Sequence, residues 1–176
     1  GAPDRDIAFT VPTESFGDIF AGFVAKQMGL GVDRLVIATN ENDILSRTLS
    51  TGDYTLSDVE VTITPSMDIQ ISSNFERLLF EAAGRDPQIV CDLMADLKAK
   101  GSYTLPNRVR DYIADLFGAG TANQAQTLET MAQVYTRSGY LADPHTAVAV
   151  RVAEQMDLGA VPMVTLATAH PAKFPD

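Results

Sequence analysis

The amino-acid sequence predicts an α/β fold in which helices cover a parallel sheet, and three observations support this. Residues 7–11 and 34–39 are continuous apolar runs of the kind that form buried strands. Each run is followed by a helical pattern, and residues 161–168 return to strand composition near the end of the chain. Strands that alternate with helices are typical of a parallel sheet with right-handed crossovers.

The first segment, residues 1–52, contains two strand–helix units. A helix is expected over residues 19–28, and a shorter one is expected to end at Gly52. Polar residues that can cap the second helix lie just before it: Asn40, Asn42 and Asp43.

The second segment, residues 53–138, is predicted to be a helix-rich insertion. Residues 53–66 alternate between polar and apolar side chains, which indicates an extended stretch. From residue 73 to 138 the apolar residues recur at helical spacing in four stripes, which we expect to face the core: Phe75, Leu78, Leu79 and Ala82; Ile89, Val90, Leu93, Met94 and Leu97; Val109, Tyr112, Ile113, Leu116 and Phe117; and Leu128, Met131, Val134 and Tyr135.

The third segment, residues 139–176, is predicted to contain a helix and the last strand. Asp143 is placed to cap this helix, with Pro144 at its first position. The strand over residues 161–168 leads into a tail that contains His170.

Composition and charge exclude several classes of function. The 176 residues carry 13 basic and 23 acidic side chains, a net charge of −10, without the concentrated basic face that a nucleic-acid site requires. No run approaches the ~18 apolar residues of a membrane span. Cys91 is the only cysteine, so an intrachain disulfide cannot form. Residues 1–6 lack the layout of a secretory signal, and we therefore expect a cytoplasmic protein.

The turn at residues 13–18 joins the first strand to the first helix. Because the first amides of a helix are unpaired and its N-terminus is electropositive, such a turn can hold a phosphate. The simpler interpretation is that Thr13, Ser15 or Asp18 caps the helix. Glu14 weakens the anion interpretation, since a carboxylate repels a phosphate beside it.

A serine nucleophile is another interpretation of the same turn. Residues 13–17 contain half of a G-x-S-x-G elbow between strand and helix, with Ser15 as the nucleophile, but the first glycine is absent. The general base would be His145 or His170, and the acid that orients it would be Asp143 or Asp68. His145 by itself is expected to be a surface or capping residue. The histidines and the cysteine lack ligand spacing, so we expect no metal site.

Polar residues follow three of the predicted strands, at residues 13–18, 39–43 and 168–170. In open α/β sheets, ligands bind outside the carboxyl ends of the strands. We therefore expect a binding site where these three clusters meet, although the pattern does not name the ligand.

Six short motifs lie in order along the chain: T-E-S-F-G-D followed by A-G-F (13–18 and 21–23), A-T-N-E-N-D (38–43), P-S-M-D-I (65–69), S-N-F-E-R (73–77), P-H-T-A-V (144–148) and T-A-H-P-A-K-F (168–174). Together they resemble the motifs of threonine synthases, which are pyridoxal-phosphate enzymes of fold type II. The resemblance implies that the chain is the C-terminal, three-layer α/β portion of such an enzyme, and that the N-terminal portion is its partner.

The resemblance also implies a cofactor, a substrate and a set of site residues. The first motif would hold the phosphate of pyridoxal phosphate, so the residues expected to bind the cofactor are Thr13, Ser15, Phe16, Gly17 and Asp18, with Thr168 at the pyridine nitrogen. Substrate contacts are expected from Asn40, Asn42, Asn74 and Arg77, although a structural ion pair accounts for Arg77 equally well. The reaction would convert O-phosphohomoserine and water to threonine and phosphate by γ-elimination and hydration, as the last step of threonine biosynthesis.

Two departures from the family bear on activity. The lysine that forms the Schiff base is expected upstream of this chain. The chain has four lysines, none of which lies in a matching context: Lys26, Lys98, Lys100 and Lys173. This chain alone is therefore expected to be inactive. Glu14 replaces a glycine of the family; if that position has a positive φ, it adds strain of about 1 kcal/mol or more. Glu14→Gly is then expected to raise cofactor affinity. The alternative that Glu14 favours is a phosphate- or cofactor-binding relative without activity.

Overall fold

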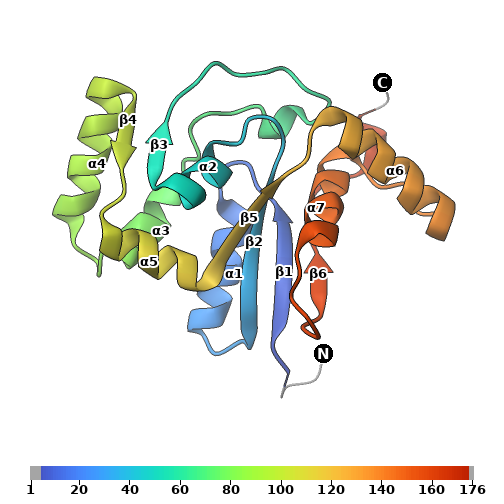
Figure 1. Cartoon of the computed structure of the whole chain (residues 1–176), viewed down its shortest axis with the longest axis horizontal. Helices are drawn as coiled ribbons and strands as arrows, with labels where there is room; N and C mark the ends of the chain where they lie inside the picture. The colour runs from blue at the N-terminus through green and yellow to red at the C-terminus, as the bar shows by residue number, and fades with distance from the viewer. Residues whose placement is uncertain (1–4, 175–176) are drawn as a thin grey trace.

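The computed structural model describes residues 5–174 (Figure 1). Residues 1–4 and 175–176 lie outside the described part. The first of these ranges belongs to residues 1–6, for which the sequence predicts no secretory signal. The elements follow in the order β1 (Ile7–Pro12), α1 (Gly17–Gln27), β2 (Val32–Thr39), α2 (Ile44–Thr51), β3 (Asp53–Thr55), η1 (Pro65–Met67), α3 (Phe75–Ala82), α4 (Pro87–Lys100), β4 (Ser102–Thr104), α5 (Asn107–Leu116), β5 (Phe117–Thr121), α6 (Gln124–Ser138), α7 (Pro144–Gln155), β6 (Met163–Thr165) and η2 (Pro171–Lys173), where η1 and η2 are single 3-10 turns.

Four strands form a parallel sheet in the order β5-β2-β1-β6. Thr10 of β1 pairs with Val36 of β2 on one side and with Thr165 of β6 on the other. The central strands β1 and β2 are covered on both faces, which explains why their sequences are almost continuously apolar. The predicted parallel sheet is confirmed.

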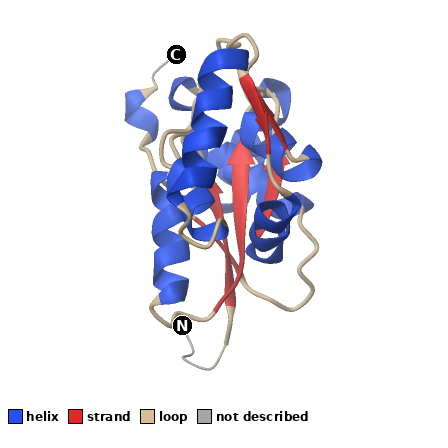
Figure 2. Cartoon of the chain, turned by 90° about the vertical axis from the view of Figure 1, so that its left-hand side faces the viewer, coloured by secondary structure: helices blue, strands red, loops and turns tan. Residues whose placement is uncertain are grey.

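Helices cover both faces of the sheet, so the fold has three layers (Figure 2). Alternate residues of β2 face opposite layers. Leu35 and Ile37 belong to the large core that α1, α3 and α5 complete. Val36 and Ala38 pack with Val152 of α7 on the opposite face. The predicted three-layer α/β class is therefore confirmed.

Strand β5 lies where the sequence predicts only helices. Phe117 completes the helical spacing of the preceding stripe, but it is the first residue of β5. The strand also contains two glycines, which have low strand propensity. Gly120 is required because β5 passes close to α7: a Cβ there would lie 2.7 Å from Val152 Cγ1. The helical prediction is therefore wrong at residues 117–121.

The apolar stripe of α6 does not face the core, so that prediction is also wrong. Leu128 and Tyr135 are 51% and 57% exposed, whereas Thr127 and Thr130 are buried. The helix packs on α7, with Leu128 and Tyr135 on the outside and with Met131 and Val134 half-buried. The stripes of α3, α4 and α5 do contribute to the core, with the exception of Tyr112.

The helix-rich region also contains a small antiparallel pair, β3 with β4, in which Tyr54 stacks on Tyr103 with the ring centroids 4.8 Å apart. Residues 56–64, predicted to be extended, have no regular structure. Asp143 caps α7 as predicted, accepting hydrogen bonds from the amides of His145 and Thr146. Among residues 5–174, none of the helices has the length and apolar character needed to cross a membrane.

Candidate functional site at the carboxyl edge of the sheet

The carboxyl ends of β1, β2 and β6 meet at one edge of the sheet, where the sequence places its three polar clusters. Thr13 N, just past β1, donates to Ala38 O of β2 at 2.8 Å. Leu166 N, just past β6, donates to Thr10 O of β1 at 2.9 Å. The loops that follow these three strands therefore start side by side.

Phe16 determines the shape of the loop between β1 and α1. Its φ is 69°, in the left-handed region that non-glycine residues rarely adopt. Its buried ring packs edge-on against Phe75, with the centroids 5.2 Å apart, and lies 5.9 Å from Phe117. This packing offsets the backbone strain. The strain predicted at Glu14 is wrong, because the left-handed residue of this loop is Phe16.

The N-terminus of α1 has no side-chain cap. The predicted capping by Thr13, Ser15 or Asp18 is therefore wrong. Thr13 Oγ1 instead donates back to Val11 O at 2.7 Å, within the turn. The first turn of α1 is left with its backbone donors unpaired.

These donors border a small hollow. In the described part of the chain, the amides of Gly17, Asp18 and Ile19 have no acceptor. The hollow has a volume of about 80 Å³ and is lined by residues 12–19. An uncapped helix N-terminus beside a small hollow suits an anion of the size of phosphate.

The segment before α3 holds the carbonyl groups of the same loop. Asn74 donates to Ser15 O from its backbone N at 2.9 Å and from Nδ2 at 2.8 Å. Ser72 Oγ donates to Glu14 O at 2.8 Å. Asn74 thus supports the loop, and its direct contact with a substrate stays a prediction.

Asn40 and Asn42 are buried and hold the loop that precedes η1. Asn40 Nδ2 donates to Thr64 Oγ1 and to Asp68 Oδ1, both at 2.8 Å. Asn42 exchanges two hydrogen bonds of 2.9 Å with the backbone of Glu60. Both amide groups are engaged within the chain, and their contact with a substrate stays a prediction.

Arg77 and Thr168 have side chains without a hydrogen-bond partner among residues 5–174. Arg77 is exposed on α3, beside Phe20 and Val90, and the ion pair considered for it is absent from the described residues. Thr168 lies partly buried in the tail, three residues beyond the end of β6.

His145 is buried, which corrects the prediction of a surface or capping residue. Its Nδ1 lies 3.2 Å from Asp143 Oδ1, and its Nε2 lies 3.3 Å from Ser66 N. The Nδ1 of His170 accepts a backbone amide of its own turn at 3.1 Å. Within the part of the chain that is described, neither histidine bonds to Ser15, so the serine-nucleophile interpretation has no support.

Two carboxyl groups at this edge have shifted pKa values. Burial raises the pKa of Glu14 and Asp18 adds to this rise; a protonated His145 would oppose it. Burial alone would also raise the pKa of Asp143, but hydrogen bonds from His145 and Thr146 outweigh it, and the pKa lies below its usual range. Across the described residues, no cluster of three or more His, Cys, Asp or Glu side chains could hold a metal ion.

Comparison with solved structures places this fold in a known class. The pyridoxal-phosphate-bound threonine synthase of Brucella melitensis matches with a TM-score of 0.97 and 56% identity, over 99% of this chain and 38% of that chain. Yeast threonine synthase matches with a TM-score of 0.92 and 40% identity, over 97% and 37%. A pyridoxal-phosphate-dependent aspartate racemase, at 13% identity and a TM-score of 0.59, shares the fold alone. The fold is that of pyridoxal-phosphate enzymes of fold type II.

Sequence comparison finds similarity to threonine synthases. The family description "Threonine synthase, C-terminal" matches residues 146–176. The threonine synthase of Pseudomonas aeruginosa is 49% identical over 177 residues, which is 100% of this chain and 38% of that protein. The chain is similar to the C-terminal portion of threonine synthases, and it spans 37–38% of the length of these relatives.

Proposed function

We propose that this chain holds the phosphate of pyridoxal phosphate in a threonine synthase, and that the complete protein converts O-phosphohomoserine and water to threonine and phosphate. The observation that carries the proposal is the uncapped N-terminus of α1 beside its hollow of about 80 Å³. The relatives named above support the choice of cofactor. The alternative, a relative without activity, depended on Glu14; its φ is not positive, so of the strain and the charge considered for it only the charge remains.

The residues present fit the phosphate group of the cofactor. The amides of Gly17, Asp18 and Ile19 can each donate to a phosphate oxygen, and the helix dipole favours the negative charge. Ser15 is exposed, and its hydroxyl can add a further hydrogen bond. Thr13 and Phe16 then act through the shape of the turn, the first by its bond to Val11 O and the second by its buried ring.

Thr168 is proposed to contact the pyridine nitrogen through a neutral hydroxyl, in the tail that returns to this edge after β6. When bound, pyridoxal phosphate supplies an electron sink for the elimination. Among the proposed substrate contacts, Arg77 has an exposed side chain, so its guanidinium is accessible to an anionic group. Phosphate release and threonine formation from O-phosphohomoserine by the complete protein test the proposal, and a protein that binds the cofactor without either product overturns it.

The Schiff-base lysine is proposed to come from the remaining part of the enzyme. Two of the lysines of this chain are engaged away from the proposed site. Lys26 Nζ donates to Val32 O, near the opposite end of β2, and Lys100 pairs with Asp96 at 2.9 Å at the end of α4. We therefore expect this chain alone to be inactive.

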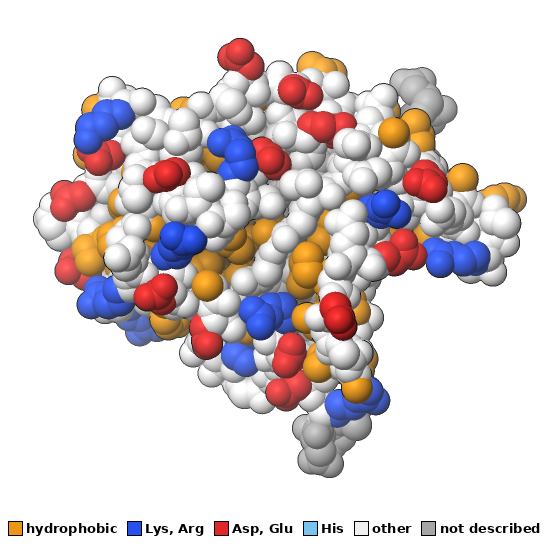
Figure 3. Space-filling view, in the orientation of Figure 1, with side chains coloured by type: hydrophobic (Ala, Val, Ile, Leu, Met, Phe, Trp, Pro, Cys, Tyr) orange, Lys and Arg blue, Asp and Glu red, His pale blue; other side chains and the backbone are white. Residues whose placement is uncertain are grey.

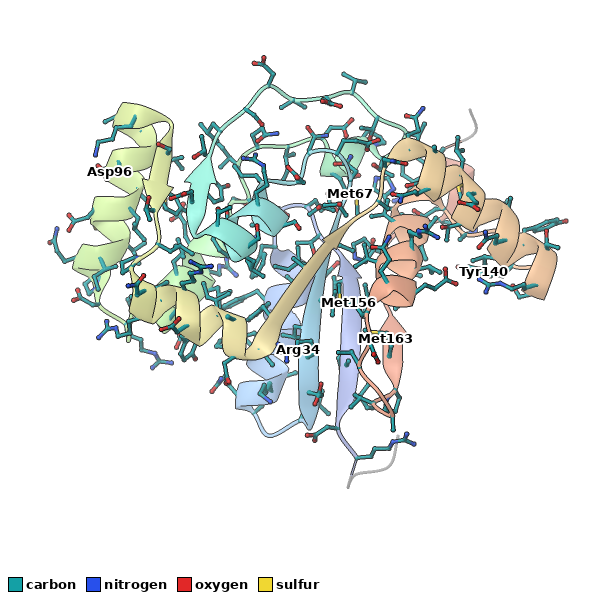
Figure 4. All side chains as sticks on the ribbon, in the orientation of Figure 1. Arg34, Met67, Asp96, Tyr140, Met156 and Met163 are labelled. Carbon is teal, nitrogen blue, oxygen red and sulfur yellow. The ribbon has the colours of Figure 1, made fainter. Side chains whose placement is uncertain are left out.

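The apolar stripe of α6 is proposed to contact that remaining part. Leu128 and Met131 line a groove of about 500 Å³ together with Pro144 and Phe174. Figure 3 shows apolar surface between charged side chains over α6, and Figure 4 shows Tyr140, which is 51% exposed, just beyond the end of the helix. Because the chain spans only 37–38% of its relatives, polypeptide of the same enzyme is the proposed occupant.

Leu128→Asp is expected to lower the thermal unfolding midpoint of the complete protein, because burying a leucine contributes about 1.5–3 kcal/mol that a carboxylate cannot supply. Leu30→Asp is the matched control: Leu30 is 49% exposed and Leu128 is 51% exposed. Leu30 follows α1, on the opposite edge of the sheet from α6. Equal midpoints for the two variants would show that the α6 stripe is not an interface.

Glu14→Gln is expected to raise the affinity of the complete protein for pyridoxal phosphate by roughly three- to ten-fold at neutral pH, because it removes a negative charge beside the bound phosphate. Glutamine replaces the glycine considered above, since the strain at this position is absent and only the charge remains. Burial raises the pKa of Glu14, so its carboxyl is protonated at a higher pH than usual. The advantage of the variant should therefore shrink as the pH falls through that raised pKa.

Binding titrations at several pH values check this expectation. The ratio of the two dissociation constants at each pH cancels the titration of the cofactor itself. A ratio that does not change with pH, or one that favours the native protein, would contradict it.

A further inference from the structure

His145 joins three segments that are far apart in the sequence. Its Nδ1 faces Asp143, the cap of α7, at 3.2 Å, and its Nε2 faces Ser66 N in η1 at 3.3 Å. Its ring packs on Phe174 with the ring centroids 4.7 Å apart. Because the side chain is almost completely buried, these contacts lie inside the protein.

The direction of the hydrogen bonds determines the tautomer of the ring. A backbone amide only donates, so Nε2 must accept from Ser66 and carries no proton. The single proton of the neutral ring then lies on Nδ1 and is donated to Asp143. Asp143 also accepts from His145 N at 2.9 Å and from the amide and hydroxyl of Thr146, so the carboxylate that orients the ring is itself held in place.

Both contacts of the ring lead to the candidate site. Ser66 precedes Met67, which is buried in the same core cluster as Val148 and is labelled in Figure 4 near the carboxyl edge of the sheet. Phe174 ends the tail that begins at Thr168. Between them, the turn η2 is closed by the bonds from Lys173 N to His170 O and from Phe174 N to Pro171 O, at 3.0 and 2.9 Å. The position of Phe174 therefore constrains the position of Thr168.

We infer that His145, as the neutral Nδ1–H tautomer, is a positioning residue that holds η1 through its Nε2 and the C-terminal tail through its ring, and so places the hydroxyl of Thr168 for the cofactor. Only the last step rests on the proposed function, because the contacts of His145 do not involve the cofactor. The residue acts through Ser66 and Phe174 and does not touch the reacting atoms.

The first experiment tests the tautomer of His145 directly. In the complete protein labelled with ¹⁵N-histidine, the Nδ1 resonance of His145 should show a bonded proton and the Nε2 resonance should show none. His145→Gln, which removes the ring, assigns the signal, because the resonances lost in this variant are those of His145. A proton on Nε2 in the neutral ring overturns the inference.

Two variants then separate the two contacts. His145→Phe keeps a ring on Phe174 but cannot accept from Ser66 N, whereas the carbonyl oxygen of His145→Gln can accept but leaves Phe174 without its ring. In the phenylalanine variant, hydrogen exchange should rise by roughly five- to ten-fold in the 65–67 segment and stay unchanged in the tail, the effect of losing one hydrogen bond. In the glutamine variant the tail should exchange faster, and the absorbance band of bound pyridoxal phosphate should shift.

Helix α4, at the far end of the molecule, is the internal control for exchange in both variants (Figure 1). A purely structural role would raise exchange in both segments together, in proportion to the loss of stability, and that result overturns the inference. If the native complete protein binds no pyridoxal phosphate, the proposed function fails, while the exchange pattern and the tautomer still decide the role of His145.

Discussion

Replacing Gly17 with aspartate should weaken the binding of pyridoxal phosphate to the complete protein by about ten-fold or more. Two like charges near 4 Å at a protein surface repel each other by about 4 kcal/mol. A loss of about 1.4 kcal/mol in binding free energy already raises the dissociation constant ten-fold. Gly17 is the first residue of α1, and its amide is one of the unpaired donors. A Cβ built there would have Asn74 Nδ2 as its nearest neighbour, at 3.9 Å, so a side chain fits without displacing the loop. The added carboxylate would lie beside the proposed phosphate position.

Gly17→Asn is the matched control for this change. Asparagine has nearly the same shape as aspartate and carries no charge, so it reports the cost of the side chain alone. We expect its dissociation constant to stay within about three-fold of the native value, because the neighbouring atoms leave room for it. Pyridoxal, which lacks the phosphate, should bind both variants alike. Equal loss of pyridoxal-phosphate affinity in the two variants would show that the phosphate binds elsewhere.

The sequence predicts the strands that are buried on both faces, because these are continuous apolar runs. It does not predict a strand whose composition is determined by contacts with distant parts of the chain. β1 and β2 are central and covered on both faces, so their apolar runs identify them. β5 was not predicted because Gly120 allows the close approach of α7, and that contact is invisible in the local sequence. The stripe of α6 has helical spacing whether it faces a core or a partner, since periodicity reports an apolar face and not what covers it.

The site could be predicted in position but not in detail. The order of strands and helices places residues 13–18 at the carboxyl edge of a parallel sheet, which is enough to locate an anion site. The replacement of the family's glycine by Glu14 predicted backbone strain at position 14, whereas the left-handed residue is Phe16. A phenylalanine with a positive φ has no signal in the local sequence. The burial of His145 was also missed, since its partners Ser66 and Phe174 are distant in the chain. Asp143 and Pro144, which precede His145, predict a helix cap but do not indicate that the imidazole ring is buried.

Phe16→Ala should destabilise the complete protein by about 3–5 kcal/mol, the usual cost of removing a buried phenylalanine ring. The ring is 1% exposed and contacts Phe75 and Phe117, so its loss leaves a cavity between α1, α3 and β5. The same change should weaken pyridoxal-phosphate binding, because the loop that presents the amides of α1 loses its anchor.

Phe16→Gly gives a test of the backbone that alanine cannot give. Both variants remove the ring, but glycine also removes the Cβ that disfavours a φ of 69° by about 1–2 kcal/mol. Glycine should therefore be the less destabilising of the two, as measured by denaturant unfolding of the complete protein.

Phe75, which is equally buried and begins α3, supplies the control pair. The φ of Phe75 is not positive, so Phe75→Gly should lower the free energy of unfolding by roughly 0.5–1 kcal/mol more than Phe75→Ala does. If alanine is the better residue at both positions, the left-handed conformation of Phe16 is wrong. The loop that directs the free amides of α1 toward the hollow then needs a different geometry, because Phe16 directly precedes α1 and the helix starts there without a side-chain cap.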